Sequence, residues 1–425
     1  MGGGAASRTV RRQISTKASR SEHGGRTVPR HQAPLNGPLP EAEQRWHHRL
    51  VKIHLPLLIA LSAWCATPTN AQSVRGIIDV HVHTSPTLYT QLGDVLASTG
   101  ITRFVNLSGG SSPRRLAKSR EAARQLEGRT AFCVNLAWRD ISRPDFVKRQ
   151  VSLLRMAANL GARCLKISKA LGLGVPDPKN SDGYLAVDDP LLDPIWREAG
   201  RLGFPVFIHT GDPKAFFAPS GPQNERRDEL SVHPEWSFAD PSYPRREALL
   251  AARDRVLAKH RGTTFIGVHF ANNPEDLDYV GRILAAHPNL YVDIAARLPE
   301  IGRHPSAKVR ALFLRFQDRI LFGTDLGFNR GGIMLGSVGR DRPDLLDLFW
   351  FYAVHFRFFE TNDRAFRHPT PIQGRWPIDA ISLPQIAREK IYRTNALRLF
   401  WPDEMGDAVD REALRLAPGL ASFLQ

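Results

Sequence analysis

The sequence of 425 residues contains only three cysteines, Cys65, Cys133 and Cys164. So few cysteines exclude a small scaffold held together by a network of disulfide bonds. Cys133 and Cys164 lie in apolar segments of strand-like composition, where we expect buried free thiols. A hydrophobic core must therefore stabilise the chain, and a hydrophobic content of 42% permits a large one.

Long hydrophobic runs are also absent. The apolar stretch at residues 55–66 is shorter than the roughly 20 residues that a membrane-spanning helix needs. It follows Lys52 and precedes small and polar residues that end at Ala71, which is the order of segments in a secretory signal peptide. We therefore expect a signal peptide at residues 51–71, export to the periplasm or the medium, and no stable membrane span after cleavage. A single anchoring helix is the alternative.

Residues 1–50 show no apolar periodicity and are rich in Gly, Arg, Ser and Pro. Such a segment buries too little surface to compensate for its loss of conformational entropy. We expect these residues to be disordered, or to be a wrongly assigned leader with the true start near Val51.

The positive charge of the chain is unevenly distributed. The formal net charge is +16, but residues 1–72 hold ten basic and three acidic residues, which leaves 48 basic and 39 acidic residues in the body. The body also lacks a run in which Lys or Arg alternates with aromatic residues, so we expect no nucleic-acid partner. We interpret the excess as solvated surface and as a preference for an anionic small-molecule substrate.

No glycine-rich phosphate loop follows the first predicted strand, which argues against an open dinucleotide-binding sheet. Short β-branched and apolar runs alternate with segments of helical composition, the pattern of a parallel α/β sheet. We predict a (β/α)8 TIM barrel over residues 75–402 with a C-terminal tail at 403–425; an open doubly wound sheet is the alternative. The eight predicted strands lie at residues 76–83, 101–107, 130–137, 162–168, 204–210, 263–270, 290–296 and 319–325.

Two predicted connections are unusually long, at residues 212–261 after the fifth strand and 326–388 after the eighth. Segments that leave the carboxyl ends of barrel strands form the walls of the active site. We therefore predict that these two loops cover the site. The aromatic residues expected to pack over it are Phe216, Phe217, Trp236 and Trp350.

His81 and His83 mark the end of the first predicted strand. Side chains two residues apart face the same side of a strand, so both imidazoles and Asp79 should point into the barrel, and Val80 and Val82 toward the helices. Two neighbouring imidazoles are suited to bind zinc or a related divalent ion.

Three further strand ends carry residues of the same chemistry. His209 ends the fifth predicted strand, His269 the sixth and Asp325 the eighth. The carboxyl ends of barrel strands meet in one ring, so we expect these side chains to converge with the first two histidines. A carboxylate among imidazoles is also placed to accept a proton from a water molecule that a metal activates.

This series of residues resembles the amidohydrolase superfamily. The motifs IIDVHVHTSP, FPVFIHTGDP and RILFGTDLGF resemble its amidohydrolase-related (type 2) branch, which contains aminocarboxymuconate-semialdehyde decarboxylase and lactone hydrolases. The resemblance covers about residues 75–402 and specifies the metal site better than the reaction. The metal ligands that it implies are His81, His83, His209 and Asp325, and the catalytic residues are Asp325 and His269.

Four cationic residues lie near the ends of predicted strands: Arg139 after the third, Lys166 within the fourth, Lys169 after the fourth and Arg297 after the seventh. We predict that they bind an anionic substrate, with surface salt bridges as the alternative for the arginines. Lys166 has a second interpretation, because two-metal members of the superfamily use a carboxylated lysine at the end of strand four. We favour one divalent ion, zinc, with manganese as the alternative.

These observations favour an exported hydrolase that attacks a C–O or C–N bond of a small anionic substrate with metal-activated water. A metal-dependent non-oxidative decarboxylase of a small carboxylic acid is the alternative. A non-catalytic binding protein is a third class, against which the intact set of ligands argues. The expected partner is a small-molecule substrate, and assembly into a homo-oligomer stays open.

Overall fold

The structure is a computed structural model that describes residues 76–339 and 341–405. The predicted leader, the predicted signal peptide with Cys65, and most of the predicted C-terminal tail lie outside the described residues. Within the described part, no helix combines the length and the hydropathy needed to cross a membrane.

Each of the eight predicted strands is present. They are β1 (Ile77–Thr84), β2 (Ile101–Asn106), β3 (Thr130–Asn135), β4 (Cys164–Ile167), β7 (Val206–Ile208), β8 (Phe265–Gly267), β9 (Leu290–Asp293) and β10 (Ile320–Leu321). Strands that follow one another in this order are neighbours in the sheet, and all these pairs are parallel. Their carboxyl ends therefore lie along one edge of the sheet.

The sheet closes into a ring between the first and the eighth strands. The chain continues from β10 through residues 322–325 into β11 (Leu326–Asn329), which pairs parallel with β1. The backbone N–H of Val80 donates to the carbonyl of Phe322 at 3.0 Å, and the N–H of Asp325 donates to the carbonyl of His81 at 2.9 Å. The fold is a (β/α)8 TIM barrel, as the strand count predicted.

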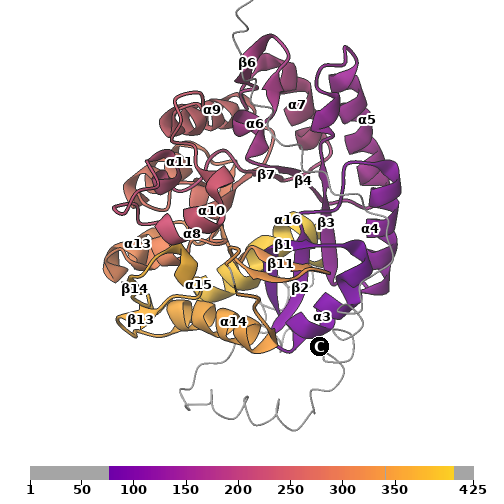
Figure 1. Ribbon diagram of the computed structural model, residues 1–425. Helices are drawn as coiled ribbons and strands as arrows, with labels where there is room; N and C mark the ends of the chain where they lie inside the picture. The colour runs from indigo at the N-terminus through magenta and orange to yellow at the C-terminus, as the bar shows by residue number, and fades with distance from the viewer. Residues whose placement is uncertain (1–75, 340, 406–425) are drawn as a thin grey trace, which may run out of the picture. The chain divides into compact units, whose positions relative to one another are not determined.

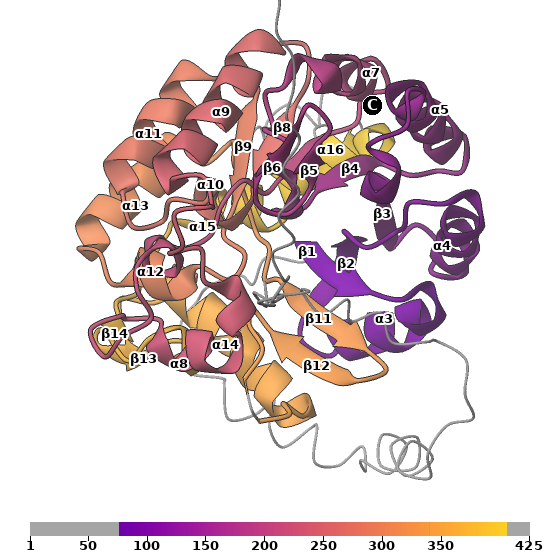
Figure 2. The ribbon, with the colours of Figure 1, turned by 45° about the horizontal axis from the view of Figure 1, so that its top comes forward.

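Helices form a layer outside the strands (Figures 1 and 2). In both views α9, α11 and α13 lie side by side, on the side opposite α4 and α5. The helix α4 begins after Ser112, whose hydroxyl accepts a hydrogen bond from the backbone N–H of Arg115. The main helices of the layer are α3 (Tyr89–Ala97), α4 (Pro113–Gln125), α5 (Phe146–Asn159), α7 (Asp193–Arg201), α9 (Arg246–Lys259), α11 (Leu277–Ala286), α13 (Ser306–Arg315) and α14 (Leu345–Glu360).

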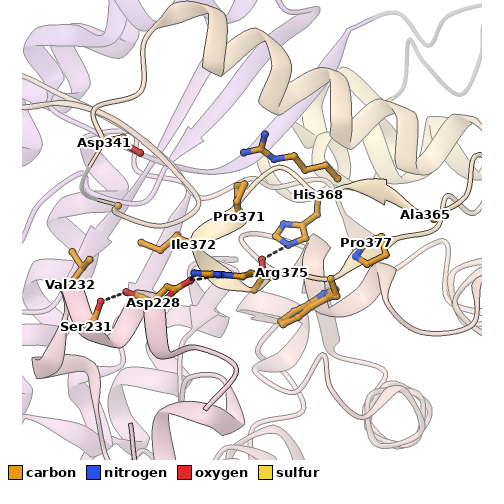
Figure 3. A pocket seen from close by; sticks show the side chains of 14 residues that line it. Asp228, Ser231, Val232, Asp341, Ala365, His368, Pro371, Ile372, Arg375 and Pro377 are labelled. Atoms are coloured by element: carbon orange, nitrogen blue, oxygen red, sulfur yellow. Dashed lines mark hydrogen bonds and ion pairs between the residues drawn. The ribbon is translucent and has the colours of Figure 1, made fainter. Parts of the chain in front are cut away.

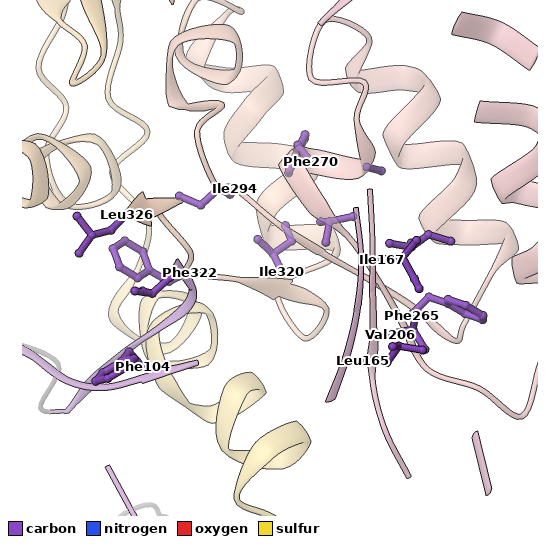
Figure 4. Packing of buried hydrophobic residues seen from close by; sticks show 14 of the residues in the cluster. Phe104, Leu165, Ile167, Val206, Phe265, Phe270, Ile294, Ile320, Phe322 and Leu326 are labelled. Carbon is purple, nitrogen blue, oxygen red and sulfur yellow. The ribbon is translucent and has the colours of Figure 1, made fainter. Parts of the chain in front are cut away.

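The strands are covered by apolar residues on both faces, as expected for a parallel sheet. The outer face packs against the helices, and Figure 4 shows part of this cluster, with Leu165, Val206 and Phe265 from three neighbouring strands. The inner face forms a second cluster, in which Phe207 stacks on Phe400 of α16 (Asn395–Phe400) with ring centroids 5.8 Å apart. Burial of each such large side chain contributes about 1.5–3 kcal/mol.

The strand β1 contains a bulge that changes which side chains face the barrel. Its pairing with β2 gains one extra residue between Asp79 and Val82. Val80 packs in the inner cluster, whereas the Asp79 carboxylate accepts a hydrogen bond at 2.7 Å from the hydroxyl of Tyr352 on α14. The predicted alternation was therefore wrong for Asp79 and Val80, because a bulge shifts the period of two by one residue.

Cys133 and Cys164 form a disulfide bond, so the expectation of free thiols was wrong. The two residues are direct partners in the pairing of β3 with β4, with their Cα atoms 4.4 Å apart. Both side chains are fully buried in the inner cluster. The sequence shows two cysteines in apolar strands but not the register that places them opposite one another.

The two long connections are present, after β7 and after β10, and the connection after β4 is also extended. The elements after β4 are α6 (Ala170–Leu173), β5 (Pro176–Asp177), β6 (Asn180–Tyr184) and η3 (Pro190–Leu192). Those after β7 are η4 (Lys214–Phe217), α8 (Arg227–Val232) and η5 (Pro234–Trp236). Those after β10 are β11, β12 (Gly332–Leu335), β13 (Phe366–Arg367), η6 (Pro371–Gln373), β14 (Pro377–Ile378), α15 (Gln385–Glu389) and the π-helix η7 (Lys390–Thr394).

Shorter elements complete the described chain. They are η1 (Pro86–Leu88), η2 (Trp138–Asp140), α10 (Val268–Ala271), α12 (Leu298–Gly302) and η8 (Pro402–Glu404).

Three of the four aromatic residues that were predicted to cover the site pack against one another. Phe216, Phe217 and Trp236 pack together in one apolar cluster, and the Trp236 ring lies 5.0 Å from Nζ of Lys169, which follows β4. Trp350 does not join them. It lies on α14 with 39% of its surface exposed and with the guanidinium of Arg367 over its ring, so its predicted place over the site was wrong.

Candidate metal centre

His81 lies inside the barrel with a side chain that is 1% exposed. Its Nδ1 is 2.8 Å from Oδ2 of Asp293, the last residue of β9. An ionised carboxylate only accepts hydrogen bonds, so Nδ1 carries the proton and Nε2 keeps a free lone pair. That Nε2 is buried and has no hydrogen-bond partner within the described residues. A buried acceptor without a partner points to a ligand at this position.

His83 and Asp325 face the same space. Nε2 of His81 and Nε2 of His83 each lie 3.4 Å from Oδ1 of Asp325. A tetrahedron of ligands with metal–ligand bonds of about 2.0–2.1 Å has edges of about 3.3–3.4 Å, so these separations fit a zinc ion. Nδ1 of His83 is 2.7 Å from the hydroxyl of Ser108, which fixes the ring as an outer partner does in metal sites.

The charge states suit ligands of a divalent ion. Burial lowers the pKa of His81 well below its usual value, so the ring is neutral at pH 7. Burial acts to raise the pKa of the Asp325 carboxyl, but the nearby His81 and a hydrogen bond from His83 outweigh it, and the pKa is lowered. The centre therefore presents the neutral imidazole of His81, the imidazole of His83 and the carboxylate of Asp325, which are residue types that bind zinc.

Asp293 orients the centre, and the sequence analysis missed it. Its Oδ2 faces His81, and its Oδ1 accepts the backbone N–H of His269 at 2.8 Å. Its oxygens also lie close to ring nitrogens of His81 and His269. Because both oxygens already accept hydrogen bonds, we interpret Asp293 as a residue that orients metal ligands and not as a metal ligand itself. Burial raises its pKa to about 6, which leaves it ionised at neutral pH. Asp293 lies in the middle of the predicted strand 290–296, whereas the observed strand ends at this residue, so its place at a strand end had no sequence signal.

His269 stands on a strained turn. The φ angles of His269, Phe270, Ala271 and Asn272 are 55°, 56°, 56° and 53°, a left-handed conformation at four successive residues without glycine. Each residue in this conformation costs about 1–2 kcal/mol, so the surrounding structure must hold the turn in place. Strain of this kind concentrates at functional sites.

Two arginines of α9 hold the left-handed turn. Nη1 of Arg253 donates to the carbonyl of Ala271, and Nη2 of Arg246 donates to the carbonyl of Asn272 at 2.7 Å. The turn aims His269 so that its Nδ1 donates to the carbonyl of Ala295 at 2.8 Å. Because a carbonyl only accepts, Nε2 of His269 is the free acceptor, and burial lowers the pKa of the ring well below its usual value.

His209 lies at the far end of the same row of imidazoles. Ring centroids are 5.3 Å apart for His81 and His83, 5.1 Å for His81 and His269, and 4.5 Å for His269 and His209. Its Nε2 lies 3.3 Å from Oδ1 of Asp212. The structure does not group its ring nitrogens with His81, His83 and Asp325, and its predicted role as a ligand stays a prediction.

The predicted lysines have different surroundings. Nζ of Lys169 donates to Oδ2 of Asp212 at 2.5 Å, so this lysine is paired inside the protein. Lys166 is 6% exposed, and its Nζ has no hydrogen-bond partner within the described residues. Burial lowers its pKa to about 8, while the nearby Asp293 and Asp325 act to raise it. An ammonium group in this position is available to a substrate anion.

The predicted arginines also differ. Arg297 is 6% exposed and close enough to His269 to lower the pKa of that ring, and it forms no ion pair within the described residues. Arg139 is exposed in η2 and contacts none of the site residues in the part of the chain that the structure describes. Arg297 is therefore placed to bind a substrate anion, and the role of Arg139 stays a prediction.

A cavity of about 900 Å³, shown in Figure 3, is lined by His368 but by none of the four site histidines. It is lined by residues of α8, of the 365–377 segment and by Asp341, and Arg375 crosses it to form an ion pair with Asp228. None of the predicted site residues lines it. We therefore place the candidate active site at the converging imidazoles and carboxylates and not in this cavity.

Imidazoles and a carboxylate that converge at the carboxyl ends of the strands of a (β/α)8 barrel define a metal-dependent barrel enzyme. The chain belongs to the amidohydrolase family, whose model matches residues 78–401. The resemblance seen in the sequence motifs is thereby confirmed. No curated protein matches the sequence.

Similar solved structures span nearly all of the barrel. A 2,6-dihydroxybenzoate decarboxylase is 15% identical, with a TM-score of 0.44, over 77% of this chain and 99% of that chain. An amidohydrolase from Burkholderia multivorans with bound zinc is 13% identical, with a TM-score of 0.41, over 77% and 99%. A 4-oxalomesaconate hydratase from Rhodopseudomonas palustris is 14% identical, with a TM-score of 0.40, over 79% and 98%. At this similarity the reaction has to be argued from the site itself.

Removal of the orienting carboxylate should weaken metal binding. In Asp293→Ala, His81 loses the acceptor that fixes its ring, and we expect zinc affinity to fall by about 10–100-fold, the usual effect of such outer partners. Asp293→Asn should lose less zinc affinity, because its amide oxygen can still accept a hydrogen bond from Nδ1–H of His81. Wild-type affinity should also fall as pH drops through about 6, because protonation of Asp293 removes the same acceptor.

Zinc affinity is measured by competition with a chromophoric chelator. Asp278→Ala, an exposed aspartate of α11 that pairs with Lys308, is the matched control and should bind zinc as the wild type does. An unchanged affinity in Asp293→Ala would contradict the orienting role.

Proposed function

We propose that the chain is an exported hydrolase that uses one divalent metal ion to cleave a C–O or C–N bond of a small anionic substrate. The proposed ion is zinc, with manganese as the alternative. His81, His83 and Asp325 would hold the ion, with His209 as the further ligand that the family resemblance implies. Asp325 and His269 would handle protons.

The common orientation of the imidazoles carries this proposal. His81 and His269 both donate from Nδ1 to fixed acceptors, Asp293 and the carbonyl of Ala295, at 2.8 Å each. Their Nε2 atoms and the Asp325 carboxylate are therefore proton acceptors or metal ligands in the resting site. Hydrolysis uses such groups directly, because a water molecule must lose a proton when it attacks a carbonyl carbon.

The residues of the chain have distinct tasks in this reaction. A bound divalent ion would lower the pKa of a water molecule and polarise the carbonyl group of the substrate. Asp325, ionised at neutral pH, would accept the proton of that water and pass it to the leaving group. His269, a neutral imidazole buried beside His81, would accept a hydrogen bond or a proton through Nε2.

Two cations would hold the anionic part of the substrate. Lys166 is buried without a partner for its ammonium group, and Arg297 is buried without an ion pair within the described residues. A buried cation without a directly bonded anion is unfavourable, and a carboxylate of the substrate would supply one. This supports an anionic substrate more than a neutral one.

Non-oxidative decarboxylation is the second candidate, and Lys166 is the observation that favours it. A decarboxylase must deliver a proton to carbon, and the Lys166 ammonium group is the buried proton donor beside the metal ligands. In this reaction Asp325 and His269 would be relay groups. Hydrolysis remains preferred because these two groups start as acceptors.

Export is part of the proposal. The predicted signal peptide at residues 51–71 supports it, and so does the disulfide bond between Cys133 and Cys164, since disulfides persist mainly in oxidising compartments.

The reaction class is tested with a panel of substrates. Metal-reconstituted protein is supplied with lactones, N-acyl compounds and hydroxybenzoates, while acid release and carbon dioxide release are measured separately. We expect acid release from a lactone or an N-acyl compound that carries a carboxylate. Carbon dioxide release from a hydroxybenzoate without any hydrolysis would contradict the proposal and favour the decarboxylase.

The number of metal ions is tested at His269. On the one-metal proposal, His269→Ala should keep about one metal per chain but lose about 100-fold or more in rate, because it removes a general acid or base. The control is His287→Ala, which replaces a half-buried histidine outside the site. This variant should keep both the metal content and the rate of the wild type. Two metal equivalents in the wild type, falling when Lys166 or His269 is replaced, would show that a two-metal site with a carboxylated Lys166 is present.

A further inference from the structure

The disulfide bond lies inside the barrel, one layer below Lys166. Cys133 of β3 pairs with Cys164 of β4. Two residues further along these strands, Asn135 pairs with Lys166. Because side chains two residues apart share a face, the disulfide occupies the layer below Asn135 and Lys166 on the inside of the barrel. Figure 2 shows β3 and β4 close together at this place.

The β3 side of the bond supports His83. The side chain of Asn135 accepts the N–H of Gly110 at 2.9 Å and donates to the carbonyl of Leu107 at 3.0 Å, which fixes the turn between them. Ser108 in this turn contacts Nδ1 of His83 at 2.7 Å. The turn also rests on Cys133, since a Cβ atom at Gly109 would lie 2.2 Å from the carbonyl oxygen of Cys133.

The β4 side supports Lys166. The strand β4 has four residues, and Cys164 is the first. Nζ of Lys166 has no hydrogen-bond partner among the residues that the structure describes, so the position of this side chain depends on its strand and on the packing around it. The covalent bond at Cys164 fixes the start of that strand against β3.

We propose that the Cys133–Cys164 disulfide is a positioning element of the metal centre, and that the centre reaches full metal affinity only after these two thiols have been oxidised. The inference rests on the proposed metal site. In the oxidation, the two thiols lose two protons and two electrons, the S–S bond forms, and the disulfide of a thiol-oxidising protein accepts the electrons and becomes two thiols. Because both cysteines are fully buried, this exchange belongs to folding and not to the folded enzyme.

This arrangement ties metal binding to export. A chain that is still in a reducing compartment would have its strands β3 and β4 in place by hydrogen bonds alone. Its Ser108 contact to His83 and its Lys166 would be less well fixed, and it would bind zinc weakly. Oxidation after export would then give the centre its full zinc affinity in the compartment that contains the substrate.

The test compares one sequence in two states. The full chain is unfolded, reduced and refolded either with a thiol reductant or with glutathione disulfide, and zinc affinity is measured by chelator competition. We expect the dithiol form to keep the far-ultraviolet circular dichroism of the disulfide form but to bind zinc at least tenfold more weakly. The double variant Cys133→Ala, Cys164→Ala should behave as the dithiol form does, and Asn135→Ala in the disulfide form should weaken zinc binding as well.

Leu154→Ala is the matched control, because it removes a fully buried side chain from α5 outside the inner cluster. It should lower stability and leave zinc affinity unchanged. Equal zinc affinity in the two forms, or two free thiols in the protein isolated from its natural source, would overturn the proposal. So would failure of both the dithiol form and the double variant to fold, because the bond would then support the whole barrel. None of these measurements needs a substrate, so a failed substrate panel leaves this test intact.

Discussion

The contact between Asp293 and His81 is the interaction on which the rest of the site depends. One buried carboxylate fixes the tautomer of His81 with Oδ2 and anchors the backbone of His269 with Oδ1. It thereby sets two imidazoles that come from different strands. The carboxylate can do so at neutral pH because burial raises its pKa only to about 6. The free Nε2 of His81 follows from this one residue, whereas the free Nε2 of His269 follows from the bond of its Nδ1 to the carbonyl of Ala295.

The barrel meets this constraint at an energetic cost. The left-handed turn at His269–Asn272 is unfavourable by itself, and Arg246 and Arg253 of α9 hold it by bonds to its carbonyl groups. The bulge in β1 likewise brings His81 and His83 inward while Asp79 turns to Tyr352. The backbone is irregular at both histidine positions because several side chains must be directed to one point.

The sequence predicted the barrel and the histidine cluster because both depend on patterns along the chain. Strands alternate with helices, and strand ends must meet, so His81, His83, His269 and Asp325 could be brought together without coordinates. Asp293 was missed because it lies in the middle of the predicted strand 290–296, and only the structure shows that the seventh strand ends there. The disulfide, the bulge and the pairing of Lys169 with Asp212 depend on register and on side-chain contacts between strands, which no single segment of sequence contains. Trp350 was misplaced for a similar reason, because the sequence does not show toward which neighbour each face of helix α14 turns.

The central claim is that His81, His83 and Asp325 hold a divalent metal ion whose ligands Asp293 orients. The most direct measurement is anomalous X-ray scattering at the zinc absorption edge from crystals of zinc-reconstituted protein. The account predicts one strong peak within bonding distance of Nε2 of His81, Nε2 of His83 and a carboxylate oxygen of Asp325. A peak elsewhere, or none at this position, would contradict it.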